Sequence, residues 1–419
     1  MMGFVRRVWP LTLRGTGALA LCVAGFVVAH EAGLIELVYF AALLAAVLVL
    51  SVISLWFTRR IDAVSRSLSP EVATVGRESV VTVRVGVRNA LPTSPGTWDD
   101  TVPAGLVARA RGVFPAVGSA MRGGERAVEL RYTVEGRIRG IHHLGPFGLT
   151  VTDPFGLARR RMRLGGKTQV TVAPRVIELP VFRGSSGETG GTRETASTQL
   201  GQGADNLVAR PYAPGDSMRR IHWRATAHRD TLMVRQEEEE TSPEATVILD
   251  RGAAQWSPEA LRAPGADDSF ETAVAAAVAI VARLVRDGYT VEVLDTNGAA
   301  LAEPVPGGDL HEIDALATQF ATLTARRGDG IARTAGMFAG HQTGPVIVVT
   351  GRLRVEDALA LAPLAHHSSM PVVIAAAPSS DALARLRDRG WHTGAAFSEA
   401  ELADAWETAM ERGATHVGG

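Results

Sequence analysis

A long apolar stretch near the start of the chain constrains the fold more than any other feature. Between residues 15 and 57 the only formally charged residues are Glu31 and Glu36, which lie near the middle of the stretch. One membrane crossing needs about 20 apolar residues. The stretch therefore predicts a transmembrane hairpin over residues 1–60, in which residues 13–57 contact the membrane.

Arginines flank this apolar stretch on both sides, and the turn between its two halves carries no Lys or Arg. The flanking cations are Arg6, Arg7 and Arg14 before the stretch and Arg59, Arg60 and Arg66 after it. Because positively charged flanks stay on the cytoplasmic side, both termini and the soluble domains are expected in the cytoplasm of a two-pass membrane protein. A cleaved signal peptide is the alternative. The second apolar run favours the uncleaved hairpin.

Composition limits the chemistry that the rest of the chain can perform. The length of 419 residues favours more than one soluble domain, and the formal net charge of −1 argues against nucleic acid as a partner. The only cysteine, Cys22, lies inside the apolar stretch. Disulfides, cysteine-ligated zinc and cysteine nucleophiles are therefore excluded from the soluble part.

Alternating patterns predict a β-rich domain over residues 61–183. Valines alternate with polar residues at 79–88, the same alternation returns at 128–134, and a further short strand fits residues 169–172. These strands, separated by Gly and Pro turns, are typical of an all-β sandwich. Residues 184–206 contain almost no large apolar side chain, which predicts a flexible linker.

Continuous apolar runs in residues 241–419 predict parallel strands that are covered on both faces. These runs are ATVILD, TVEVLD, PVIVVT and PVVIAA, at residues 245–250, 290–295, 345–350 and 371–376. Helices are expected between and after them, at residues 268–287, 310–326, 355–364, 381–389 and 398–412. A turn at residues 295–298 is typical of a hairpin that adds an antiparallel edge. The prediction is a doubly wound α/β domain.

The most distinctive segment of the chain is a basic motif within residues 207–240. Pro214 and Gly215 fit the central positions of a type II turn, and Asp216 can cap the start of a short helix. No paired nucleophile and base accompanies them, which suits binding better than catalysis. The residues assigned to partner binding are Arg210, Tyr212, Gly215, Asp216, Arg219, Arg220, Trp223, Arg224 and Arg235.

This motif resembles the signature of the bacterial family called domain of unknown function 58 (DUF58). The residues that carry the resemblance are Arg210, Tyr212, Pro214, Gly215, Asp216, Arg219, Ile221, His222, Trp223, Ala227, Leu232, Val234 and Arg235. The resemblance implies paired transmembrane helices, a β-rich region and a C-terminal von Willebrand factor A-like domain. Such proteins are often encoded beside MoxR-type AAA ATPases, so it also implies an adaptor role with such an ATPase or an envelope-assembly partner.

Two departures from the family pattern matter. His228 stands where arginine is frequent, and the stretch from Asp250 to Ala254 lacks both hydroxyls of the Asp-x-Ser-x-Ser pattern by which A-type domains bind metal. Because both hydroxyl ligands are missing, we expect no metal and no cofactor for this chain.

Two functions remain open at this point. The first is a non-enzymatic interaction module, in which the motif is a docking surface or an internal brace with Trp223 packed between the β-rich and α/β domains. The second is a metal-dependent or hydrolytic enzyme that uses Asp250, Asp295 and Thr350, because ligands bind at the carboxyl ends of strands in open α/β sheets. The sequence contains no phosphate loop, dinucleotide fingerprint or serine-hydrolase elbow. We therefore expect no enzymatic activity.

Overall fold

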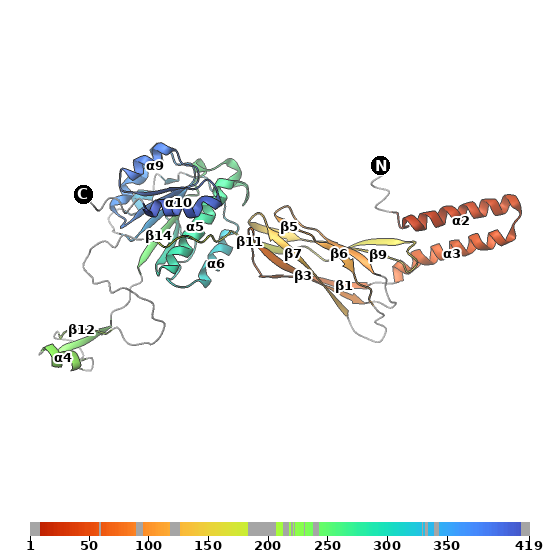
Figure 1. Ribbon diagram of the computed structural model, residues 1–419, viewed down its shortest axis with the longest axis horizontal. Helices are drawn as coiled ribbons and strands as arrows, with labels where there is room; N and C mark the ends of the chain where they lie inside the picture. The colour runs from red at the N-terminus through yellow and green to blue at the C-terminus, as the bar shows by residue number, and fades with distance from the viewer. Residues whose placement is uncertain are drawn as a thin grey trace.

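The chain folds into a helix pair, a β-rich region and an α/β domain, in that order along the sequence (Figure 1). The computed structural model describes residues 9–57, 60–88, 95–117, 126–182, 207–212, 218, 221, 223–229, 231–237, 243–328, 330–331, 334–338 and 343–411. At this level the predicted fold class is confirmed: two apolar helices, a β-rich region and a parallel five-stranded sheet with helices.

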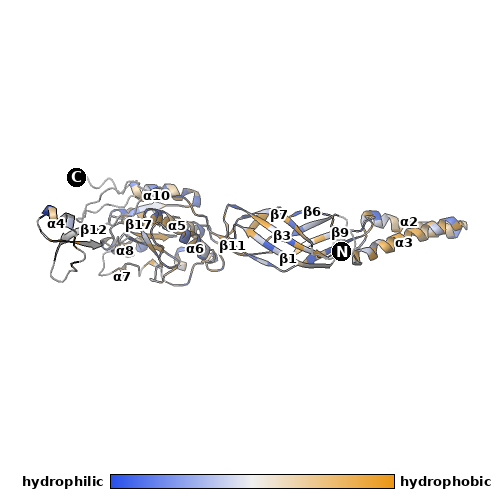
Figure 2. Cartoon of the chain, turned by 90° about the horizontal axis from the view of Figure 1, so that it is seen from below, coloured by the Kyte–Doolittle hydropathy of each residue, from blue (hydrophilic) through white to orange (hydrophobic). Residues whose placement is uncertain are grey.

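The N-terminal pair consists of α2 at Leu13–Ala32 and α3 at Ile35–Phe57. Both helices are long and apolar enough to span a membrane, and Figure 2 shows apolar residues along each of them. Thr12 caps α2 by accepting a hydrogen bond from the Gly15 N–H at 3.1 Å. Gly33 ends α2 with a φ of 67°, a left-handed conformation that glycine adopts without strain.

The β-rich region contains three sheets. Its strands are β1 (Arg60–Ser69), β2 (Ala73–Thr74), β3 (Glu78–Arg88), β4 (Gly96–Asp100), β5 (Leu106–Ala108), β6 (Arg111–Phe114), β7 (Arg126–Gly136), β8 (Gly140–Leu144), β9 (Phe147–Thr152), β10 (Arg159–Leu164) and β11 (Thr168–Ala173). The sheet orders are β1-β3-β7-β5, β10-β9-β4-β6 and β2-β11-β8. Trp98 of β4 lies 5.8 Å from Tyr132 of β7 between ring centroids, so the two four-stranded sheets share one apolar core.

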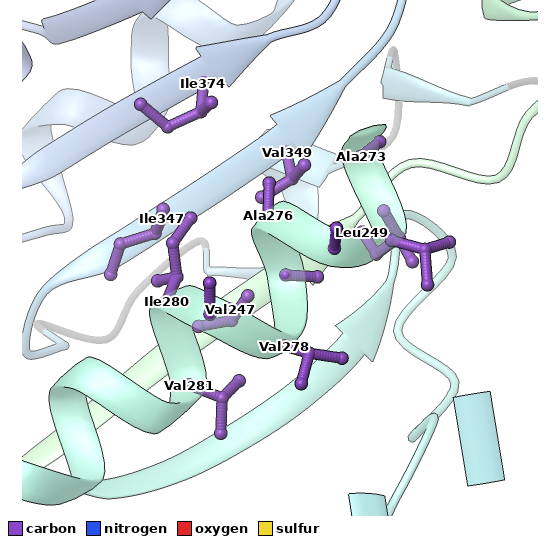
Figure 3. Close-up of a cluster of buried hydrophobic side chains, with 14 of the residues drawn as sticks. Val247, Leu249, Ala273, Ala276, Val278, Ile280, Val281, Ile347, Val349 and Ile374 are labelled. Carbon is purple, nitrogen blue, oxygen red and sulfur yellow. The ribbon is translucent and has the colours of Figure 1, made fainter. Parts of the chain in front are cut away.

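The α/β domain is built on a five-stranded sheet in the order β15-β14-β16-β17-β18, with every neighbouring pair parallel. Its strands are β14 (Glu244–Leu249), β15 (Thr290–Asp295), β16 (Val346–Thr350), β17 (Pro371–Ala375) and β18 (His392–Ala395). Its α-helices are α5 (Asp268–Arg286), α6 (His311–Phe320), α7 (Thr334–Met337), α8 (Val355–Leu361), α9 (Ser380–Arg387) and α10 (Leu402–Glu411). In Figure 3, Ile280 of α5 lies against Val247 of β14 and Ile347 of β16. A second apolar cluster covers the other face of the sheet.

The structure departs from the sequence prediction at both edges of this sheet. The antiparallel edge expected after residue 295 is reduced to two isolated bridges, in which Leu294 faces Ala300 and Val291 faces Val305. The turn itself forms, because the Gly298 N–H donates to the carbonyl oxygen at residue 295 over 2.9 Å. At the opposite edge β18 adds a fifth parallel strand that the apolar pattern did not predict.

Arg139 joins the β-rich region to the α/β domain. Its side chain, in the turn between β7 and β8, is 1% exposed, and its Nη1 lies 2.8 Å from Oε2 of Glu271 in α5. The guanidinium also lies over the ring of Phe270 at 5.4 Å and donates through Nη2 to the carbonyl oxygen of Leu323. Burial lowers the pKa of Arg139, whereas the Glu271 carboxylate opposes that shift. A buried charge placed among these partners fixes the junction between the two parts.

Candidate functional site

The basic motif folds into a small unit of two strands and one short helix, which we call the motif unit (residues 207–237). β12 at Leu207–Pro211 pairs antiparallel with β13 at Met233–Glu237, and α4 at Trp223–Arg229 lies between them in the chain. Figure 1 shows β12 and α4 apart from the five-stranded sheet.

The motif unit has an apolar interior of its own. Ile221, Met233 and Val234 are 5%, 1% and 3% exposed, and a β-bridge joins Ile221 to Val234. The hydroxyl of Thr226 in α4 accepts a hydrogen bond from the Met233 N–H at 3.0 Å, which ties the helix to β13. Short as it is, the helix is therefore held by side chains of the same unit.

The predicted partner-binding residues divide into those that the structure places and those that it does not. Arg210 lies in β12 opposite Val234, and Arg235 lies in β13 opposite Ala209, so these two arginines stand on neighbouring strands. Tyr212 follows β12 and is half-buried, and its backbone N–H donates to the Leu232 carbonyl at 2.7 Å. Trp223 and Arg224 open α4. The predicted turn and helix cap lie outside the described residues, as do the site residues Gly215, Asp216, Arg219 and Arg220.

Trp223 projects into solvent. Its side chain is 69% exposed, and Met218 of the same unit is 65% exposed. The alternative in which Trp223 packs between the β-rich and α/β domains does not agree with this exposure. Ile221, Met233 and Val234 of the same unit are buried instead, so the apolar interior that the structure describes here forms without the indole.

A second group of polar side chains lies at the carboxyl ends of β14 and β16. Asp250 and Thr350 are both 0% exposed, and the Thr350 hydroxyl donates to Oδ2 of Asp250 at 3.0 Å. The Gly252 N–H donates to Oδ1 of the same carboxyl group at 2.8 Å. Burial raises the pKa of Asp250 to about 7, against the opposing effect of these two donors.

Asp295, at the end of β15, is held by a separate set of donors. Nε of Arg326 lies 2.5 Å from its Oδ2, and Nη1 of Arg251 lies 3.7 Å from the same oxygen. The backbone N–H of Thr296 donates to Oδ1 at 2.7 Å. Because Asp295 stabilises the charged guanidinium, it raises the pKa of Arg326. This carboxylate serves as an internal anchor for two arginines.

The backbone at Gly252 and Gly330 packs closely around the Asp250 carboxyl group. A Cβ atom added at Gly330 would lie 2.6 Å from Oδ1 of Asp250, and one added at Gly252 would lie 2.8 Å from the Gly330 Cα. Within the part of the chain that the structure describes, no three His, Cys, Asp or Glu side chains are grouped to hold a metal ion. The three residues of the alternative enzyme site, Asp250, Asp295 and Thr350, thus lie together at the carboxyl ends of β14, β15 and β16, which we call the sheet edge. There each carboxylate contacts internal partners. The edge is suited to bracing the strands and to binding a proton near neutral pH.

Sequence reasoning missed the arginines that organise this edge and the domain junction. Arg326 donates a hydrogen bond to Asp295, which is 31 residues away in the sequence, and Arg139 donates one to Leu323, which is 184 residues away. Separations of this size carry no periodic signal. A cavity of about 550 Å³ between the β-rich and α/β parts was likewise not predicted, and it is lined by charges of both signs. Its charged residues are Arg77, Arg175, Glu178, Arg286 and Asp314.

Part of this chain, including nearly all of the motif unit, matches the model of a known protein family. Residues 208–373 match the family model described as "Protein of unknown function DUF58". The matched range begins in the motif unit and continues through β16 into β17. The chain therefore carries a DUF58 domain, preceded by two apolar helices and a β-rich region.

Two individual proteins are similar to this chain. The first is "Uncharacterized protein YeaD" of Bacillus subtilis (strain 168), which is 23% identical over 337 residues, covering 79% of this chain and 80% of that protein. The second is a solved structure, the cohesin module from Clostridium perfringens ATCC13124 family 33 glycoside hydrolase. It is 11% identical with a TM-score of 0.15, over 28% of this chain and 99% of that chain.

Proposed function

We propose that the protein is a membrane-anchored adaptor without catalytic activity, whose motif unit docks a cytoplasmic protein partner. The resemblance to DUF58 proteins makes a MoxR-type AAA ATPase the first candidate partner, and an envelope-assembly protein the second. The same resemblance suggests that the α/β domain is von Willebrand factor A-like. The observation that carries the proposal is the 69% exposure of Trp223 on a unit that buries Ile221, Met233 and Val234 instead.

Tryptophan and arginine are the residues most enriched at the energetic centres of protein interfaces. An exposed indole loses contact with water when a partner covers it, and a guanidinium beside it can pair with a carboxylate through two parallel hydrogen bonds. The motif unit offers both types, with Trp223 next in sequence to Arg224 and with Arg210 and Arg235 on its strands. An acidic, partly apolar surface is the complement of this set.

The arrangement at the sheet edge supports the non-enzymatic part of the proposal. A general base needs a lone pair that can reach a substrate, whereas Asp250 is 0% exposed and accepts from Thr350 and Gly252. Asp295 is 1% exposed and is engaged by Arg326. Both carboxylates that the enzyme alternative requires are thus used for internal contacts.

The test is binding of the purified full-length protein, in detergent, to the MoxR-type ATPase of the same cell. Trp223→Ala should weaken binding by more than tenfold, because truncation of a central aromatic residue commonly costs about 2 kcal/mol or more. Phe397→Ala is the matched control, since Phe397 is also exposed, at 62%, but lies outside the motif unit. Equal binding by the parent and the Trp223 variant contradicts docking through this unit.

A charge reversal separates recognition from folding. Arg219→Glu, Arg220→Glu and Arg224→Glu are made singly, and at least one should abolish recovery of the partner while leaving the melting temperature unchanged. If all three unfold the protein, or none affects recovery, the motif is an internal brace. Recovery of no partner, together with turnover of a substrate that Asp250→Asn abolishes, would favour the enzyme.

A further inference from the structure

The turn between β9 and β10 is fastened to the start of helix α2. The Thr12 N–H donates to the Leu157 carbonyl at 2.8 Å, and the Thr12 hydroxyl donates to the Gly156 carbonyl at 2.6 Å. In the other direction, the Arg159 N–H donates to the Pro10 carbonyl at 2.7 Å. Hydrogen bonds of Thr12 and Arg159 therefore hold this turn where the apolar helix begins.

Close packing and internal hydrogen bonds fix the conformation of the turn. A Cβ atom at Gly15 would lie 1.9 Å from the Leu157 carbonyl oxygen, so the contact requires glycine in the first turn of α2. Asp153 is 3% exposed, and its carboxylate accepts from the Phe155 N–H at 2.9 Å and from the Ala158 N–H at 2.6 Å. The turn is thus rigid, yet it leaves the Phe155 side chain 63% exposed.

The position of α2 places this phenylalanine at a membrane boundary. A helix of 20 residues is about 30 Å long, which equals the thickness of a bilayer's hydrocarbon core. When α2 spans the bilayer, its first turn lies at the level of the lipid headgroups. Trp9, 44% exposed and bonded through Nε1 to the Thr16 hydroxyl at 3.1 Å, lies at the same end. Aromatic residues are enriched at this depth of the membrane.

Two exposed arginines lie at this end of the β-rich region. Arg14 lies in the first turn of α2 and Arg159 opens β10, and both are exposed. Neither side chain has an ion pair or hydrogen bond to any residue within the described ranges, whereas Arg161 further along β10 pairs with Asp99 at 2.9 Å. Cations beside a membrane helix are attracted to the phosphates of anionic lipids.

We propose that this end of the β-rich region is a phospholipid-binding surface, formed by Phe155, Arg14 and Arg159. Phe155 inserts between lipid headgroups, and the two guanidinium groups bind lipid phosphates. The inference rests on the membrane anchoring proposed above, and it adds a second membrane contact to the two helices. Because the turn is bonded to α2, insertion of Phe155 fixes the tilt of the β-rich region on the bilayer.

A nitroxide label on the full-length protein in bilayers measures this insertion. Cys22→Ala removes the only cysteine, and single cysteines are then introduced by Phe155→Cys, Phe397→Cys and Leu43→Cys. Phe397 is the matched control because it is 62% exposed in the α/β domain, and Leu43 of α3 reports on the membrane span. Collisions with oxygen, which dissolves in lipid, are compared with collisions with a water-soluble nickel chelate.

We expect the label at 155 to collide preferentially with oxygen, with a several-fold higher oxygen-to-nickel ratio than the label at 397. A water-like ratio at 155 with a lipid-like ratio at 43 overturns the lipid-binding surface but leaves the membrane anchor intact. Water-like ratios at both positions overturn the anchor as well. A label at 155 that is protected from both reagents indicates a protein contact and also overturns the inference.

The arginines are tested in the same labelled protein. Arg14→Gln with Arg159→Gln should lower the oxygen-to-nickel ratio at 155 in bilayers that contain phosphatidylglycerol. Arg131→Gln, at a side chain that is 71% exposed in β7, is the control. An unchanged ratio in the double variant overturns the assignment of the two arginines to lipid phosphates.

Discussion

Thr350 donates its hydroxyl hydrogen to Asp250 across the ends of two neighbouring parallel strands, over 3.0 Å. Burial nevertheless dominates, because it raises the pKa of Asp250 from 3.8 to about 7. The folded protein therefore binds this proton more tightly than the unfolded chain does. The result is a carboxyl group that changes charge near neutral pH inside the sheet edge.

The first prediction concerns pH. Stability contributed by Asp250 is fully present below its unfolded pKa of 3.8 and is lost as the pH rises to about 7. Over that window the slope approaches about 1.4 kcal/mol per pH unit. Asp250→Asn should remove this slope from thermal unfolding of the full-length protein, whereas Asp388→Asn, at an exposed carboxylate, should retain it. Identical pH profiles for the parent and Asp250→Asn would contradict the shifted pKa.

The second prediction uses a matched pair of glycines. Gly330→Ala brings a methyl group to 2.6 Å from Oδ1 of Asp250 and should lower stability by about 1–3 kcal/mol. Gly336→Ala meets nothing within 4 Å and lies in helix α7, so it should not destabilise the protein. Melting temperatures of the two variants provide the measurement. A loss at Gly336 equal to that at Gly330 would show that the contact with Asp250 is not the cause.

The third prediction is that the α/β domain has no tight divalent-cation site. Gly252 and Ala254 supply no oxygen ligand from a side chain, and Asp250 already accepts from a hydroxyl and a backbone N–H. A carboxylate with so few available partners does not dehydrate Mg²⁺. Titration calorimetry with Mg²⁺ and Mn²⁺ is the measurement. A clear isotherm that Asp250→Ala abolishes refutes the prediction.

The fourth prediction separates the surface of the motif unit from its interior. Trp223→Ala should cost less than about 1 kcal/mol, because a side chain that is 69% exposed gives up little buried area. Met233→Ala should cost about 2–5 kcal/mol, since its side chain is 1% exposed. Protease resistance of the motif unit in the full-length protein provides the comparison. Equal loss of resistance in the two variants means that Trp223 is an internal brace.

The fifth prediction concerns topology. Arginines flank the apolar helices and are absent from the connecting turn, which predicts that both termini lie in the cytoplasm. Protease added outside intact spheroplasts should leave residues 62–419 undigested. Digestion from outside, or a mature N-terminus near His30, is the contrary outcome.

The elements that the sequence predicted correctly are those whose own residues form an apolar run or an alternating pattern. Apolar runs identified β14 and β16, and alternation identified β3 and β7. β18 was missed because its four residues, HTGA, show neither pattern and are placed by pairing with β17. Local composition thus suffices where a strand carries its own apolar surface. It fails where neighbouring elements determine the strand.

The candidate site was less predictable than the fold, because exposure is a property of the surroundings. The sequence marks Trp223 as a large apolar residue, but the folded unit leaves its side chain 69% exposed while it buries Ile221, Met233 and Val234. At the sheet edge, position after a strand correctly brought Asp250 and Thr350 together. The distant arginine at position 326, which engages Asp295, carries no such local signal.

The short loop from Leu323 to Arg326 connects the β-rich region mechanically to the α/β domain. Leu323 accepts the hydrogen bond from Arg139 of the β-rich region, and three residues later Arg326 engages Asp295 at the sheet edge. Removing one partner from a buried ion pair such as that of Arg139 and Glu271 costs about 3–5 kcal/mol. The two parts are therefore joined through one short loop, and a torque on the β-rich region would pass through that loop to the ends of the strands.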